Sequence, residues 1–135
     1  MRSSLRTRIL LPALVGIALT GCDDANVIGP ENQLEVTNAV DQFQFQVTDL
    51  VDVDDVRSYT WQNTGTAATI DISQAVTSGS AFLTIRDAEG TILYQEDIAD
   101  DQDTTTPVGV AGMWQIEVRL ESTTGTFNFR VQKVT

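Results

Sequence analysis

Apolar and polar residues alternate along most of this chain from Leu34 onward. Within residues 42–47, Phe or Val occupies every second position and glutamine fills the positions between. A period of two places successive side chains on opposite faces, which is typical of a half-buried β-strand. The alternating segments are 34–40, 42–47, 51–56, 59–62, 68–72, 82–85, 92–94, 114–120 and 127–131. Only residues 72–76 are compatible with a short helical turn.

This succession of short strands predicts an all-β fold. Polar turns separate the segments, notably at 87–90 and 122–125. About eight short strands with such turns are typical of an antiparallel β-sandwich, here expected to be jelly-roll-like, in which two sheets share one core. A small closed barrel would use the same alternation and is the structural alternative. The expected domain covers residues 34–135.

The first 22 residues have the composition of a bacterial export signal. Three arginines precede an apolar run over 9–19, and Leu19-Thr20-Gly21-Cys22 closes it. A membrane-spanning helix needs about 20 apolar residues, so this run is too short to be one. The four closing residues resemble the lipobox of bacterial lipoproteins. That resemblance implies removal of residues 1–21, acylation of Cys22 and attachment to a membrane through the acyl chains. An ordinary signal peptide followed by an incidental cysteine is the alternative.

Residues 22–33 are rich in Asp, Asn, Gly and Pro, and we expect them to form a flexible lipidated tether. The predicted location is the bacterial cell envelope. Asp23, directly after the cysteine, resembles the inner-membrane retention signal of enteric bacteria. Retention at the inner membrane, transfer to the outer membrane and display at the cell surface all stay open.

The charge of the expected mature chain restricts its partners. All 19 acidic residues follow Cys22, against five basic ones, which gives a mature net charge of −14. Nucleic-acid binding needs clustered Lys and Arg, and a surface of this sign disfavours it. The same charge disfavours a position flat against anionic lipid. We therefore expect the domain to stand away from the headgroups.

Several catalytic arrangements are ruled out by residue counts. The chain contains no histidine, and Lys133 is its one lysine. A Ser-His-Asp triad, a Cys-His pair and histidine-ligated zinc are therefore excluded. We expect a protein that is not an enzyme and uses no cofactor. A hydrolase with a pair of carboxylates is the weakest alternative, because counting alone does not exclude it.

Three segments in the second half of the chain follow one another as Asp-x-x-Gly after a strand and two strand starts of the form Gly-x-aromatic. They lie at 82–90, 109–118 and 124–131. Together they resemble the bacterial pre-peptidase C-terminal domain, although Trp114 and Phe127 stand where that family usually has tyrosine. The resemblance implies a jelly-roll-like sandwich in an accessory role. It transfers no catalytic residue.

Two acidic clusters are candidate calcium sites, because Ca²⁺ takes six to eight oxygen ligands from carboxylates and carbonyls. The better candidate lies in the longest non-alternating loop and consists of Asp97, Asp100, Asp101 and Asp103. The second consists of Asp49, Asp52, Asp54 and Asp55. Neither has EF-hand spacing. A solvated acidic loop that protects a sheet edge is the alternative.

Aromatic residues suggest a binding surface. Tyr59 and Trp61 share one face of an otherwise polar segment, and we consider them a platform for a sugar ring or a protein partner. Burial in the core is the alternative, and it is the better interpretation of Trp114.

The sequence thus predicts an envelope lipoprotein that displays a non-catalytic binding or structural module. A carbohydrate- or polymer-binding accessory module, calcium-stabilised or not, is the alternative, and the partner is an unidentified envelope protein or glycan.

Overall fold

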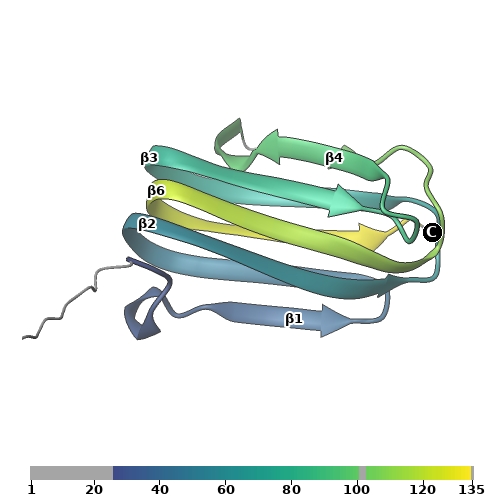
Figure 1. The fold of residues 1–135 in the computed structure, drawn as a ribbon, viewed down its shortest axis with the longest axis horizontal. Helices are drawn as coiled ribbons and strands as arrows, with labels where there is room; N and C mark the ends of the chain where they lie inside the picture. The colour runs from purple at the N-terminus through teal and green to yellow at the C-terminus, as the bar shows by residue number, and fades with distance from the viewer. Residues whose placement is uncertain (1–25, 101–102, 135) are drawn as a thin grey trace, which may run out of the picture.

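The computed structural model describes residues 26–100 and 103–134. They form a single antiparallel sheet of six strands in the order β1-β2-β6-β3-β4, with β5 paired to β3 (Figure 1). The strands are β1 (Glu35–Ala39), β2 (Gln42–Asn63), β3 (Ala68–Arg86), β4 (Ile92–Asp97), β5 (Thr104–Thr105) and β6 (Gly112–Lys133). Two 3₁₀ turns, η2 (Pro30–Asn32) and η3 (Ile98–Asp100), are the helical elements of the described residues. No helix in this part of the chain is long and apolar enough to cross a membrane.

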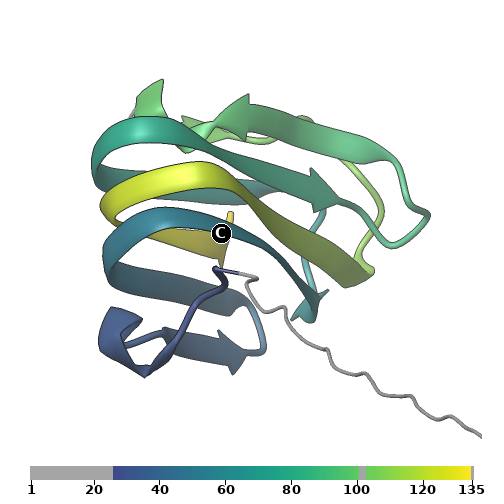
Figure 2. The same cartoon turned by 60° about the vertical axis from the view of Figure 1, so that its left-hand side comes forward.

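The three long strands β2, β3 and β6 fold over at one end of the molecule, so that each runs through two layers (Figures 1 and 2). The pairing of β2 with β6 shifts register three times between Val47 and Asp55, and that of β3 with β6 shifts between Val76 and Ser80. Bulges of this kind bend a strand without ending it. We call this end, formed by residues 48–54, 76–80 and 121–125, the bent end. The predicted all-β sandwich-like fold is confirmed.

The pairing register assigns each half-strand to a layer. The first layer contains β1, the first half of β2, the second half of β6, the first half of β3, and β5. The second layer contains the second halves of β2 and β3, the first half of β6, and β4. Every second side chain of each half-strand points between the layers, and these residues form the core.

Aromatic rings fill this core. Phe45 stacks between Phe127 and Phe129, with ring centroids 5.8 and 5.4 Å away. Trp61 and Trp114 are directly opposite each other on β2 and β6 and meet edge to face at 5.8 Å. All five side chains are at most 1% exposed. The alternation seen in the sequence therefore identifies the interior correctly on these strands.

The predicted strand boundaries were wrong at the bent end. Segments 42–47, 51–56 and 59–62, expected as separate strands, are one strand, and the turn expected at 122–125 is a bend within β6. Residues 72–76, compatible with a helical turn, belong to β3. The bulges also move Val51 and Val56 to the outside, where they are 67% and 45% exposed. A bulge adds one residue to one strand, so the alternation changes face there.

Residues 26–33 were expected to be part of a flexible tether, and that expectation was wrong. The side chain of Asn26 donates hydrogen bonds to the carbonyl oxygens of Val51 and Asp52 at 2.6 and 2.7 Å. The amide of Asp54 donates to the carbonyl oxygen of Asn26 at 2.9 Å. Ile28 is 8% exposed and belongs to the core. The domain therefore begins no later than Asn26.

The reason for this packing lies in the bulges of β2. Asn32 is 2% exposed, and its side chain donates to the carbonyl oxygens of Thr48 and Asp49 at 3.0 and 2.9 Å. Backbone groups at a bulge lose their hydrogen-bond partners on the neighbouring strand, and buried ones need other partners in their place. The side-chain amides of Asn26 and Asn32 donate hydrogen bonds to these carbonyl oxygens. Residues 22–25 lie outside the described residues.

Candidate functional site

The β3–β4 hairpin is fixed by Asp87, the first residue of the Asp-x-x-Gly motif. Its Oδ1 accepts hydrogen bonds from the amides of Glu89 and Thr91 at 3.0 and 2.9 Å. Its Oδ2 accepts one from the amide of Val110 at 3.0 Å, in the loop that leads into β6. Burial acts to raise the pKa of Asp87, but these amide donors outweigh it and hold the pKa below its ordinary value. Asp87 thus holds β3, β4 and the start of β6 together.

Beside this hairpin, the outer face of the second layer carries a polar groove, which we call the β3–β6 groove. Its volume is about 710 Å³. Phe82 on β3 is opposite Arg119 on β6 and Asp97 on β4. Directly paired residues point to the same face of a sheet, so these side chains line one surface. The lining residues are Phe82, Thr84, Arg86, Gln95, Glu96, Asp97, Glu117, Arg119 and Glu121.

The polar groups of the β3–β6 groove are held in part by one another. The amide of Gln95 donates to Thr84 Oγ1 at 3.2 Å. Arg119 forms an ion pair with Glu117 at 3.8 Å, and both side chains are more than a third exposed. An exposed pair of this length contributes little to stability, so both groups are available to a ligand. Four acidic residues and two arginines are among the lining residues, so the groove is net acidic.

Trp61, predicted as part of an exposed aromatic platform, is buried, and that site prediction was wrong for this residue. Its side chain is 0% exposed, and its indole N–H donates to the carbonyl oxygen of Ala39 at 2.9 Å. The polar residues around it occupy the outer positions of the same strand, because alternation separates neighbours onto opposite faces. Trp61 is therefore a core residue, as is Trp114.

Tyr59 is half-buried. Its ring lies 5.3 Å from Phe43 and 6.1 Å from Phe45, between the layers. Burial raises the pKa of the Tyr59 hydroxyl. It lines a small hollow of about 410 Å³ with Ser58, Thr60 and Gln115. Tyr59 is therefore partly accessible to solvent, without the tryptophan that was expected beside it.

The predicted calcium residues are only partly described. Asp101 lies outside the described residues, as does the side chain of Asp100. Asp97 Oδ1 accepts from the amide of Ala99 at 2.9 Å, and Asp103 Oδ1 accepts from that of Ile72 at 3.2 Å. Within residues 26–100 and 103–134, no three metal-ligating side chains gather in one place. Calcium binding at this loop stays a prediction.

The other acidic cluster uses its carboxylates to fasten the bent end. Asp54 Oδ1 accepts from the amide of Ser122 at 2.8 Å. Asp55 Oδ2 accepts from the amide of Ile28 and from Arg57, both at 3.1 Å. These bonds join β2 to β6 and to the N-terminal segment. The cluster therefore has a structural role in this fold.

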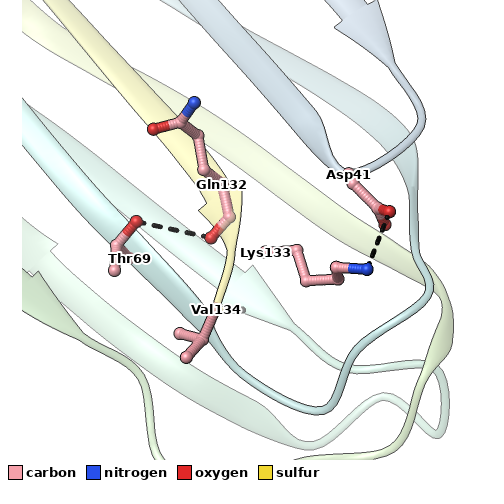
Figure 3. Close-up of a pocket in the computed structure, with 5 residues that line it drawn as sticks. All are labelled: Asp41, Thr69, Gln132, Lys133 and Val134. Carbon is pink, nitrogen blue, oxygen red and sulfur yellow. Dashed lines mark hydrogen bonds and ion pairs between the residues drawn. The ribbon is translucent and has the colours of Figure 1, made fainter.

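A further hollow of about 480 Å³ lies at the opposite end of the sheet (Figure 3). Lys133 there forms an ion pair with Asp41 at 3.3 Å and donates to Thr64 Oγ1 at 3.1 Å. The amide of Thr64 donates to Asp41, and this bond, with the nearby lysine, lowers the pKa of Asp41. The single lysine is thus engaged in joining β6 to the β1–β2 turn.

No known protein family matches this chain, and no curated protein sequence is similar to it. The lipobox and the likeness to the pre-peptidase C-terminal domain therefore rest on the residues quoted above. Cys22 lies outside the described residues.

The sequence analysis did not predict the β3–β6 groove. The residues that line it come from three strands, and no short segment of the sequence shows which residues of those strands are paired.

Proposed function

We propose that this protein is a lipid-anchored, non-catalytic binding module of the bacterial cell envelope that presents the β3–β6 groove to its partner. The observation that carries the proposal is the attachment of Asn26 to the bent end, four residues after Cys22. Four extended residues span at most about 14 Å. A lipid on Cys22 would therefore hold the bent end close to the membrane.

The charge of the bent end supports this arrangement. Asp49, Asp52 and Asp54 are exposed there, and anionic headgroups repel carboxylates. The domain is thus kept off the lipid surface while the anchor keeps it near. The β3–β6 groove runs along the outer face of the second layer, from Arg86 beside the hairpin to Glu121 at the bent end. A partner in the envelope space can reach the groove in this orientation.

Acylation of Cys22 is tested by expressing the full chain and the variant Cys22→Ser in a bacterium fed an alkyne-tagged fatty acid. We expect label on the wild-type protein and its recovery in the membrane fraction. The serine variant should carry no label and should be found in the soluble fraction. Inhibition of signal peptidase II should cause the unprocessed wild-type form to accumulate. Membrane recovery of the Cys22→Ser variant equal to that of wild type would contradict the proposal.

A further inference from the structure

We infer that the β3–β6 groove binds a neutral polysaccharide chain. This inference rests on the proposed function and specifies the ligand class of the same surface. The groove volume of about 710 Å³ falls within the range of small-ligand sites and accommodates a few sugar rings. Its floor consists of three neighbouring strands, β4, β3 and β6.

The ring of Phe82 supplies an apolar surface in an otherwise polar groove. Phe82 is half-buried, on the outer face of β3, and it lies between Asp97 on one side and Arg119 on the other. Aromatic rings with polar neighbours provide contact area at small entropic cost. One face of a pyranose ring presents C–H groups, and these pack against such a ring. The hydroxyl groups of the same sugar are then directed toward the polar neighbours.

Donors and acceptors are both present around this ring. A sugar hydroxyl donates one hydrogen bond and accepts others, so its recognition needs both kinds of group. Arg86 and Arg119 donate only, the carboxylates accept only, and Gln95 and Thr84 do both. Glu121 makes no side-chain hydrogen bond or ion pair with the described part of the chain, so its oxygens are available.

Charge selects a neutral chain over an anionic one. The groove has four carboxylates and two guanidinium groups, and the protein as a whole is acidic. An acidic polysaccharide would be repelled at long range and would place like charges together on contact. A basic polypeptide is attracted by the carboxylates, but the two arginines lie in the same groove and oppose it. A neutral glycan uses both sets of groups.

The inference is tested by isothermal titration calorimetry on the full protein, purified in mild detergent, with cellohexaose, chitohexaose, maltohexaose and mannohexaose as probes. We expect saturable binding of at least one probe. Replacing Phe82 by Ala should weaken it about tenfold, on the scale of losing an aromatic anchor. Gln95→Ala should weaken it as well and controls for any loss of stability at Phe82. Met113→Ala, on the same outer face but outside the groove, should bind like wild type.

Four outcomes would overturn the inference. They are no saturable heat with any of the four probes, unchanged binding in both groove variants, tighter binding of heparin, and tighter binding of polylysine. Near-ultraviolet circular dichroism verifies that each variant is folded. A protein that is acylated on Cys22 but binds none of the hexasaccharides keeps the proposed function and loses this inference. A protein that binds a hexasaccharide but is not acylated supports the glycan-binding groove and contradicts the proposed lipid anchor.

Discussion

The indole N–H of Trp61 donates a hydrogen bond to the carbonyl oxygen of Ala39 at 2.9 Å. Trp61 belongs to the second half of β2, in the second layer, whereas Ala39 ends β1 in the first layer. The asparagine side chain one residue before Ala39 makes a similar link, from Asn38 to the carbonyl oxygen of Thr60 at 2.9 Å. These bonds fasten the two layers at the edge where, among the described residues, no strand pairs with the outer side of the second half of β2.

Removal of the Trp61 side chain should therefore destabilise the fold. We expect Trp61→Ala to lower the free energy of unfolding by about 3–5 kcal/mol, because a buried indole leaves a large cavity. Trp61→Phe keeps most of the packing but loses the hydrogen bond, and it should cost less. Urea denaturation measures both. Val108→Ala, at a position 78% exposed, should change stability by less than about 0.5 kcal/mol. A Trp61→Ala protein as stable as the Val108→Ala control would show that the indole is not in the core.

Ile28 tests whether the N-terminal segment belongs to the domain. Ile28→Ala should lower the free energy of unfolding by about 2 kcal/mol, because its side chain is 8% exposed and packs on the core. The neighbouring Val27 is 44% exposed, so Val27→Ala should have little effect. If the two variants are equally stable in urea, the prediction that this segment is a flexible tether would be supported instead. The same comparison can be made by thermal denaturation.

Gly125 marks a close approach of β6 to β3. Its φ is +139°, and a Cβ there would collide with the carbonyl oxygen of Ala75. Gly125→Ala should cost about 3 kcal/mol or more, since backbone strain and a steric clash add together. Gly90 also has a positive φ, +86°, but nothing lies within 4 Å of its added Cβ. Gly90→Ala should therefore cost only about 1–2 kcal/mol. Urea denaturation that ranks the two variants in the opposite order would contradict the close approach.

Asp87 gives the stability of the domain a dependence on pH. Because the pKa of Asp87 is lowered by folding, its contribution is complete above the ordinary value of 3.8 and is lost as the pH falls through the lower folded-state pKa. Asp87→Asn places an N–H donor where the amides of Val110 or Thr91 need an acceptor. We expect the variant to melt at a lower temperature than wild type at pH 7. The difference should shrink as the pH falls below 3.8.

Melting curves recorded from pH 7 to about pH 2.5 measure this effect. Glu89→Gln is the matched control, because Glu89 is exposed in the same hairpin. It should melt like wild type at pH 7. A difference between Asp87→Asn and wild type that stays constant over the whole range would show that the carboxylate charge is not what the amides recognise.

Alternation of side chains identified the interior of most strands correctly. Phe43, Phe45, Phe127 and Phe129 lie at alternating positions of segments predicted to be half-buried strands, and all four are buried. The same pattern did not reveal where strands end, because Asp49, Asp52 and Ser122 adopt positive φ values inside continuous strands. Turn-forming residues mark bulges as readily as they mark turns. The direction of the chain after such a residue depends on the strands beside it.

The residues of the candidate site were also predicted only in part from the sequence. Trp61 resembled a surface residue because its sequence neighbours are polar, yet each neighbour faces outward while the indole faces inward. Phe82 was interpreted as part of an ordinary strand, and it lines the β3–β6 groove. The groove depends on which residues of β4 and β6 stand opposite β3. That register is fixed by pairing between residues far apart in the chain, and it cannot be predicted from the sequence of one strand alone.

The sequence by itself determined the all-β class, the aromatic core, the acidic charge and the absence of histidine chemistry, because each of these follows from residue identity or from a local period of two. Only the tertiary structure decided that three strands bend to supply both layers, that Asn26 and Asn32 attach the N-terminal segment to the bent end, and that Phe82 lies in a groove. These features arise from contacts between residues far apart in the chain. Such contacts are set by register and bulge geometry across the whole sheet, which no local pattern contains.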